Sequence, residues 1–229
     1  MHEFLNIPAL PVIITLAGYW VGTLCQKKWK SPILNPILIG MALVVVFLLT
    51  TGMDTQVYKA GTEKLSWLMT PATICLAIPM YEQFRILRKD LKAIAAGVAA
   101  GAVTCVVGLM VCGLLLRLDR TILVSLMPKS VTAAIGVPLG ELFGGIGAVT
   151  TASIAITGIG ANMFGLTFCR WFRITEPIAQ GVAFGTAGHV IGTAKASQVS
   201  PLVGAVSSLS LVVAGLLTAL LFPALVGIM

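Results

Sequence analysis

The segment Leu126–Gly140, LMPKSVTAAIGVPLG, places one lysine and several small or hydroxylated residues between two prolines in an otherwise apolar run. Proline lacks a backbone N–H and breaks helices, so Pro128 and Pro138 predict a discontinuous helix. A charge inside a membrane segment costs roughly 2.5–3.5 kcal/mol and is retained mainly where it is paired or functional. We therefore expect a half-helix that starts near Pro128 and directs free N–H groups into a polar cavity, an arrangement that suits an anion. The alternative is that Lys129 extends to the membrane interface and the prolines are simple kinks.

Two further stretches have the same character. Phe184–Gln198, FGTAGHVIGTAKASQ, combines His189 and Lys195 with closely spaced glycines. Trp67–Phe84, WLMTPATICLAIPMYEQF, is a hydrophobic run interrupted by two prolines. We interpret both as interrupted helices, and their recurrence favours a buried polar pocket over simple kinks.

The composition is that of a multi-pass membrane protein. Of the 229 residues, 58% are hydrophobic and 10% are charged, and the mean hydropathy is +1.01, far from the average soluble domain. The predicted fold class is therefore all-α, with helices of about 20 residues that cross the bilayer. The formal net charge is +7, but the basic residues cluster at the ends of apolar runs. This pattern indicates membrane topology and not a nucleic-acid partner.

The basic clusters set the predicted topology. Lys27–Lys30, Arg85–Lys92 and Arg170–Arg173 are expected in the cytoplasm, with the N-terminus outside. No basic region precedes the first apolar run, so no cleavable signal peptide is expected. Together with the interrupted segments, the uninterrupted spans give about seven or eight membrane segments; these spans are Ile7–Leu24, Pro32–Thr51, Lys92–Leu116, Ala148–Phe168 and Pro201–Val226.

The polar break Arg117–Arg120 divides the chain into two halves, 1–118 and 119–229, within a single membrane domain. Each half contains apolar spans and interrupted helices in a roughly similar order. This is the pattern of secondary transporters built from internal repeats. The segment Leu123–Gly140 is either re-entrant or spanning. Gly52–Lys64, which has mixed charge, is expected to be an external loop.

A pocket for a small anion is predicted where the interrupted helices meet. Polar residues recur along Ala148–Phe168 at steps near three and four, which places them on one helical face; they are Thr150, Thr151, Ser153, Thr157 and Asn162. A two- or three-carbon hydroxy- or keto-acid needs a cation, N–H and hydroxyl donors, and a partner for its α-substituent. The candidate binding residues are Lys129, Ser130, Thr132, Thr157, Asn162, Thr186, Gly188, His189 and Thr193.

His189 is also the candidate for proton coupling, because histidine titrates near neutral pH. The alternative is a structural histidine with a satisfied hydrogen bond. Lys195 either offsets the substrate charge or reaches the interface. The five cysteines show no CxxC or Cys/His ligand spacing and are interpreted as small apolar residues. The sequence contains no recognisable Ser/His/Asp set, metal-ligand cluster or phosphate loop, so neither an enzyme nor a cofactor is predicted.

Three motifs carry a family resemblance: PKSVT at Pro128–Thr132, ITG at Ile156–Gly158, and GTAGHVIGTAK at Gly185–Lys195. With these motifs the sequence resembles the LrgB/CidB family of bacterial inner-membrane proteins along essentially its whole length. The resemblance implies two competing functions. One is modulation of murein hydrolase activity and autolysis, together with a small holin-like membrane protein of the LrgA/CidA type. The other is transport of small monocarboxylates such as glycolate, glycerate, pyruvate and lactate, as in the plastidic glycolate/glycerate transporter, whose C-terminal half is LrgB-like.

The resemblance also implies a distant relation to bile-acid symporters and sodium/proton antiporters, in which broken helices cross. This sequence lacks an adjacent Asp-Asp pair and an isolated mid-span Asp, so sodium coupling of the antiporter kind is not expected. The glycines of Gly97–Gly113 give a small-residue face suited to close helix packing. That face leaves room for a homo-oligomer, most simply a dimer.

Overall fold

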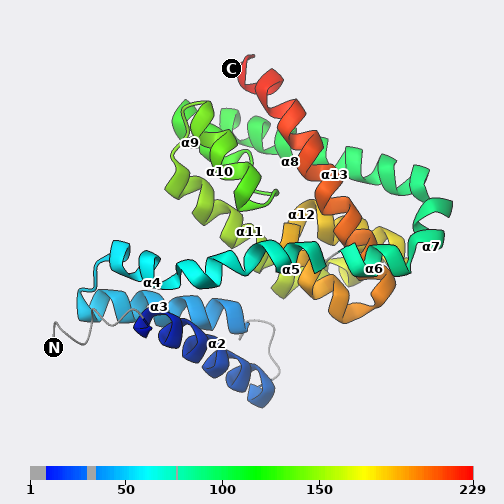
Figure 1. Cartoon of the computed structure of the whole chain (residues 1–229). Helices are drawn as coiled ribbons and strands as arrows, with labels where there is room; N and C mark the ends of the chain where they lie inside the picture. Colours follow the sequence, from blue (N-terminus) through cyan, green and yellow to red (C-terminus); the bar gives the residue numbers. More distant parts are fainter. Residues whose placement is uncertain (1–8, 30–34, 76, 229) are drawn as a thin grey trace. The chain divides into compact units, whose positions relative to one another are not determined.

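The computed structural model describes residues 9–29, 35–75 and 77–228, and every regular element in these ranges is a helix (Figure 1). The predicted all-α class is confirmed. The chain divides into two compact units, Met1–Cys75 and Leu76–Met229. These units are groupings in space, and the division into repeat halves 1–118 and 119–229 stays a prediction.

The first unit consists of α2 (Leu10–Trp29), α3 (Pro36–Thr51), α4 (Thr55–Trp67) and α5 (Met69–Cys75). Helix α3 begins where Asn35 Oδ1 accepts a hydrogen bond from the backbone N–H of Ile37 at 2.8 Å, an N-cap that satisfies one donor of the first turn. It ends at Gly52, whose φ of 66° suits glycine. Helices α2 and α3 pack closely, since a Cβ added at Gly18 would lie 3.2 Å from the backbone oxygen of Gly40.

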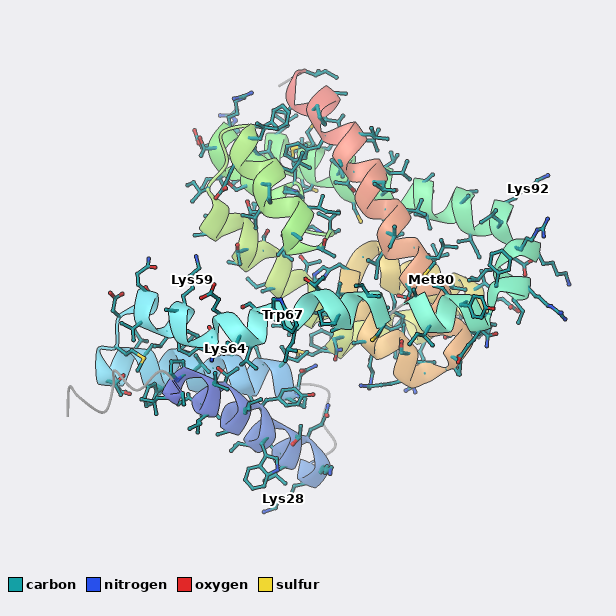
Figure 2. All side chains as sticks on the ribbon, in the orientation of Figure 1. Lys28, Lys59, Lys64, Trp67, Met80 and Lys92 are labelled. Carbon is teal, nitrogen blue, oxygen red and sulfur yellow. The ribbon has the colours of Figure 1, made fainter. Side chains whose placement is uncertain are left out.

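The segment Gly52–Lys64 is not the external loop that its mixed charge predicted, because most of it belongs to α4. One face of α4 packs against α2, where the hydroxyls of Tyr58 and Thr15 form a hydrogen bond of 2.7 Å. The charged residues lie on the other faces, and Figure 2 shows Lys59 and Lys64 projecting from the helix. A polar sequence is therefore helical here because one of its sides is covered.

The second unit is built around α12 (Pro177–Val199), which packs against α8 (Leu91–Leu115), α11 (Gly147–Trp171) and α13 (Pro201–Val226). Helices α8 and α13 cross each other (Figure 1). Their buried side chains, among them Val98, Val106 and Phe222, form much of the core. The shorter helices of this unit are α6 (Ala77–Glu82), α7 (Phe84–Lys89), α9 (Arg120–Leu126) and α10 (Ala133–Leu142).

Within the described residues, α8, α11 and α13 are long and apolar enough to cross a membrane, and α3 and α10 are shorter apolar helices. The three long helices coincide with three predicted spans, as expected of a multi-pass membrane protein. Basic side chains lie at helix ends, and Figure 2 shows Lys28 near the end of α2 and Lys92 near the start of α8. The full number of seven or eight segments stays a prediction.

The predicted interruption of Leu126–Gly140 is confirmed at Pro128, since residues 127–132 lie between α9 and α10. The predicted break at Pro138 is wrong, because this proline lies inside α10. The start of the half-helix is a correction: α10 begins at Ala133 with Thr132 as its N-cap, not near Pro128. The reason is a local turn, in which the N–H of Val131 donates to the backbone oxygen of Pro128 at 3.3 Å. This turn holds Lys129 outside either helix.

The other two interruptions are also present. Helix α12 is broken at His189, where φ is 42° and ψ is −141°. The run Trp67–Phe84 is divided among the end of α4, α5, α6 and the start of α7, with Leu76 outside the described residues. The break in α12 lies in the middle of the second unit and positions the candidate site.

Candidate functional site

The break in α12 centres on His189, which is only 4% exposed. Its backbone conformation is one that residues other than glycine rarely adopt, and such conformations persist only where the surrounding structure enforces them. The ring Nε2 lies 3.0 Å from the backbone oxygen of Ile154 in α11. Because a carbonyl oxygen only accepts, Nε2 carries the proton and donates it. Gly158, one turn further along α11, leaves the space that the ring fills.

Two more contacts hold the backbone beyond the break. Asn162 Nδ2 donates to the backbone oxygen of Ile191 at 3.1 Å and ties α11 to the second half of α12. Thr193 Oγ1 donates to the backbone oxygen of His189 at 2.9 Å and lies 2.8 Å from Ser207 Oγ of α13. Since the hydroxyl hydrogen of Thr193 is directed at His189, Ser207 is the donor in the second bond. The break is thus held by α11 and by α13.

Two candidates in the first half of α12 lie at packing contacts. Thr186 is 5% exposed, and its Oγ1 donates to the backbone oxygen of Val182 at 2.7 Å. Helix α8 approaches it at Gly101, where an added Cβ would lie 3.0 Å from that Oγ1. Gly188 faces α11, where an added Cβ would lie 2.6 Å from Cβ of Ala161. These residues determine how closely α12 packs against its neighbours.

A cavity of about 340 Å³ lies between α11 and the first half of α12. Lys129 reaches it from the turn before α10, half-buried, with its Nζ donating to Ser130 Oγ at 3.1 Å. Thr157 lines it from α11. Among the lining residues that the structure describes, Lys129 is the one with a charge. The cavity therefore offers a single cation in an uncharged wall.

The cavity has a polar end and an apolar end. A Cβ added at Gly136 would lie 2.8 Å from Cδ1 of Ile154 in α11 and 3.1 Å from the backbone oxygen of Pro128. The turn that carries Lys129 therefore lies beside Ile154, about one turn before Thr157, and Lys129 belongs to the Thr157 end. Phe168 is eleven residues further along α11, about 16 Å at the helical rise of 1.5 Å per residue. The side chains that line this far end carry no charge; they are Phe168, Cys169, Phe172, Ile174 and Phe184.

Other predicted residues lie outside the cavity lining. The side chain of Thr132 makes no capping hydrogen bond to α10. Lys195 Nζ donates to Gln198 Oε1 at 3.4 Å near the end of α12. Thr151 is exposed and bonds to the backbone oxygen of Gly147 at 2.8 Å, so the buried polar face of α11 does not include it. Of the candidate binding residues, Lys129 and Thr157 are in the cavity lining. Ser130 is bonded to Lys129, and His189 packs against Gly158 outside the lining.

The aromatic end of the cavity was absent from the predicted site. Helical spacing could have predicted part of this end. Four of the lining residues follow one another at steps of four, four and three along α11: Thr157, Ala161, Gly165 and Phe168. The next step of four reaches Phe172, but this residue lies beyond the end of α11, where helical spacing no longer determines the direction of a side chain.

Within the part of the chain that the structure describes, no three His, Cys, Asp or Glu side chains are grouped so as to hold a metal ion. The sequence matches the model of the LrgB-like family over residues 15–228. No solved structure matches the chain. The matched range includes both interrupted helices of the second unit and every residue that lines the cavity.

Proposed function

Because the chain belongs to the LrgB-like family, we propose that this membrane protein carries small monocarboxylates across the bilayer, bound as anions at Lys129. The observation that carries the proposal is that Lys129 is the one charged residue among the described lining residues of a cavity beside an interrupted helix. A half-buried cation is stabilised by a partner of opposite sign, so one cation matches one carboxylate. Glycolate, glycerate, pyruvate and lactate each carry one.

Polar groups near the lysine support the same proposal. The hydroxyl of Thr157 lines the cavity and makes no hydrogen bond within residues 9–29, 35–75 and 77–228, so it is available to a ligand's hydroxyl or keto oxygen. The cavity volume of about 340 Å³ is at the lower end of the range for small-molecule sites. A short hydroxy- or keto-acid fits this combination of size and chemistry.

The interrupted helices support a secondary-transporter architecture, in which broken helices from internal repeats meet at the substrate. In this proposal the α9–α10 turn supplies Lys129 and the break in α12 supplies His189. A proton-coupling role for His189 stays a prediction. Loss of substrate-driven proton movement in His189→Gln, with uptake retained, supports the role, and unchanged proton movement contradicts it.

Uptake by proteoliposomes tests the proposal. The wild-type protein is expected to show saturable uptake of a labelled monocarboxylate, and Lys129→Gln is expected to abolish it. Lys195→Gln is the matched control, because Lys195 bonds to Gln198 and does not line the cavity. Equal uptake by the wild type and Lys129→Gln would remove Lys129 from the site.

The same assay addresses the competing function. A modulator of murein hydrolases that works as a holin-like pore, with a partner of the LrgA/CidA type, predicts flux that rises linearly with concentration and ignores stereochemistry. A carrier predicts saturation and a preference between D- and L-lactate. The small membrane partner and the homodimer stay predictions.

A further inference from the structure

We infer that the cavity favours monocarboxylates that carry an apolar tail of several carbons over dicarboxylates. This inference rests on the proposed function, since it places the carboxylate at Lys129. It adds the chemical nature of the rest of the ligand, which follows from the residues at the two ends of the cavity.

The charged end accepts one carboxylate. Lys129 is the single cation among the lining residues that are described, and Thr157 is the nearest hydroxyl-bearing residue of that lining. A second carboxylate on the same ligand would lie towards Phe168 and Phe184, where the described lining offers it no cation. Removing an ionised group from water without a partner is strongly unfavourable. Dicarboxylates are therefore expected to bind more weakly.

The far end of the cavity stabilises apolar parts of a ligand. Phe184 and Cys169 are 2% and 5% exposed and offer carbon and sulfur to a ligand. Phe168 and Phe172 also line this end, with 51% and 71% of their surface exposed. Each methylene group buried there is expected to tighten binding about fourfold. The separation of Thr157 and Phe168 along α11, about 16 Å, leaves room for a tail of several carbons.

Gly160 lies on α11 between the two ends of the cavity. It lines the cavity one turn beyond Thr157, and a Cβ added there would meet nothing within 4 Å. A leucine at this position would therefore project into open space and occupy the path of the tail. Gly108 of α8 is the matched control, since a Cβ there also meets nothing within 4 Å and Gly108 does not line the cavity.

The test is a competition assay with the purified full-length protein in lipid nanodiscs, with acetate, butyrate, hexanoate, succinate and hexanamide as competitors of a labelled monocarboxylate. Affinity is expected to rise about fourfold per methylene from acetate to hexanoate. Succinate and the uncharged hexanamide are expected to compete more weakly than hexanoate. Hexanamide also controls for partition of the tail into lipid, and competition as strong as that of hexanoate would overturn the inference.

The two glycine variants test whether the preference for longer tails arises in the cavity. Gly160→Leu is expected to weaken hexanoate at least tenfold and to leave acetate within about threefold, whereas Gly108→Leu changes neither. The comparison of acetate, butyrate and hexanoate uses the wild-type protein, so it tests the inference even if Gly160→Leu does not fold. Equal affinity for acetate and hexanoate would overturn the inference and leave the proposed function intact. Absence of competition by every monocarboxylate would overturn the proposed function itself.

Discussion

Gly158 of α11 lies directly against the ring of His189 in α12, so closely that a Cβ added at residue 158 would stand 2.5 Å from Cε1 of the histidine. The same ring donates a hydrogen bond to Ile154, one turn earlier on α11. The helix break and the contact between α11 and α12 are therefore a single feature. A substitution that displaces the His189 ring is therefore expected to affect both the break and the helix contact.

The first prediction concerns this contact. Gly158→Ala is expected to displace the His189 ring and to lower the free energy of unfolding by about 1–3 kcal/mol, the usual effect of overpacking. Gly160→Ala, half a turn away, is the control, because its Cβ meets nothing within 4 Å and alanine favours a helix by about 1 kcal/mol. Denaturant unfolding in detergent micelles measures both. Equal stability of the two variants would show that the ring is not held as described.

The second prediction isolates the backbone of His189. His189→Gly and His189→Ala both remove the ring, but only glycine adopts φ of 42° and ψ of −141° without strain. That strain is worth about 1–3 kcal/mol, more than the roughly 0.4–1 kcal/mol by which glycine favours the unfolded chain. His189→Gly is therefore expected to be the more stable variant in the same unfolding experiment. A more stable alanine variant would mean that α12 is not broken at this residue.

The third prediction concerns the hydroxyls that join α12 to α13. Thr193→Val leaves the buried hydroxyl of Ser207 without its partner and is expected to cost about 1–3 kcal/mol of unfolding free energy. Combined with Ser207→Ala, the two effects should be non-additive by about 0.5–3 kcal/mol. Ser210→Ala is the control, because Ser210 bonds to Val206 of its own helix at 2.7 Å. Additivity of Thr193→Val with Ser207→Ala would contradict the contact.

Much of the helix pattern could be predicted from single residues whose backbone chemistry is restrictive. Pro128 marked the break between α9 and α10. Pro138 did not mark a break, because it lies inside α10. The polar run Arg117–Arg120 marked the end of α8. In that run Arg117 takes a φ of 54°, and Asp119 caps α9 by accepting from the N–H of Thr121 at 2.9 Å. These effects depend on residues that are neighbours in the sequence, so they can be predicted from the sequence alone.

The remainder depends on contacts between distant segments. The mixed charges of Gly52–Lys64 led to the prediction of a loop, whereas the segment forms α4, which is capped by Asp54 and packs against α2. Thr193 had the residue type of a binding residue, yet its hydroxyl is engaged by His189 and Ser207. The apolar end of the cavity was not predicted because Phe172 and Phe184 are brought together only by the packing of α11 against α12.

The most direct test of the central claim, that a monocarboxylate occupies the cavity at Lys129, is protection of an introduced thiol. Ala187→Cys, which lines the cavity, and Ala194→Cys, which is exposed outside it, are compared in a cysteine-free background. A monocarboxylate is expected to slow modification of Cys introduced at 187 by an anionic thiosulfonate and to leave position 194 unaffected, and Lys129→Gln is expected to remove the protection. Equal modification rates at position 187 with and without the ligand would contradict the account.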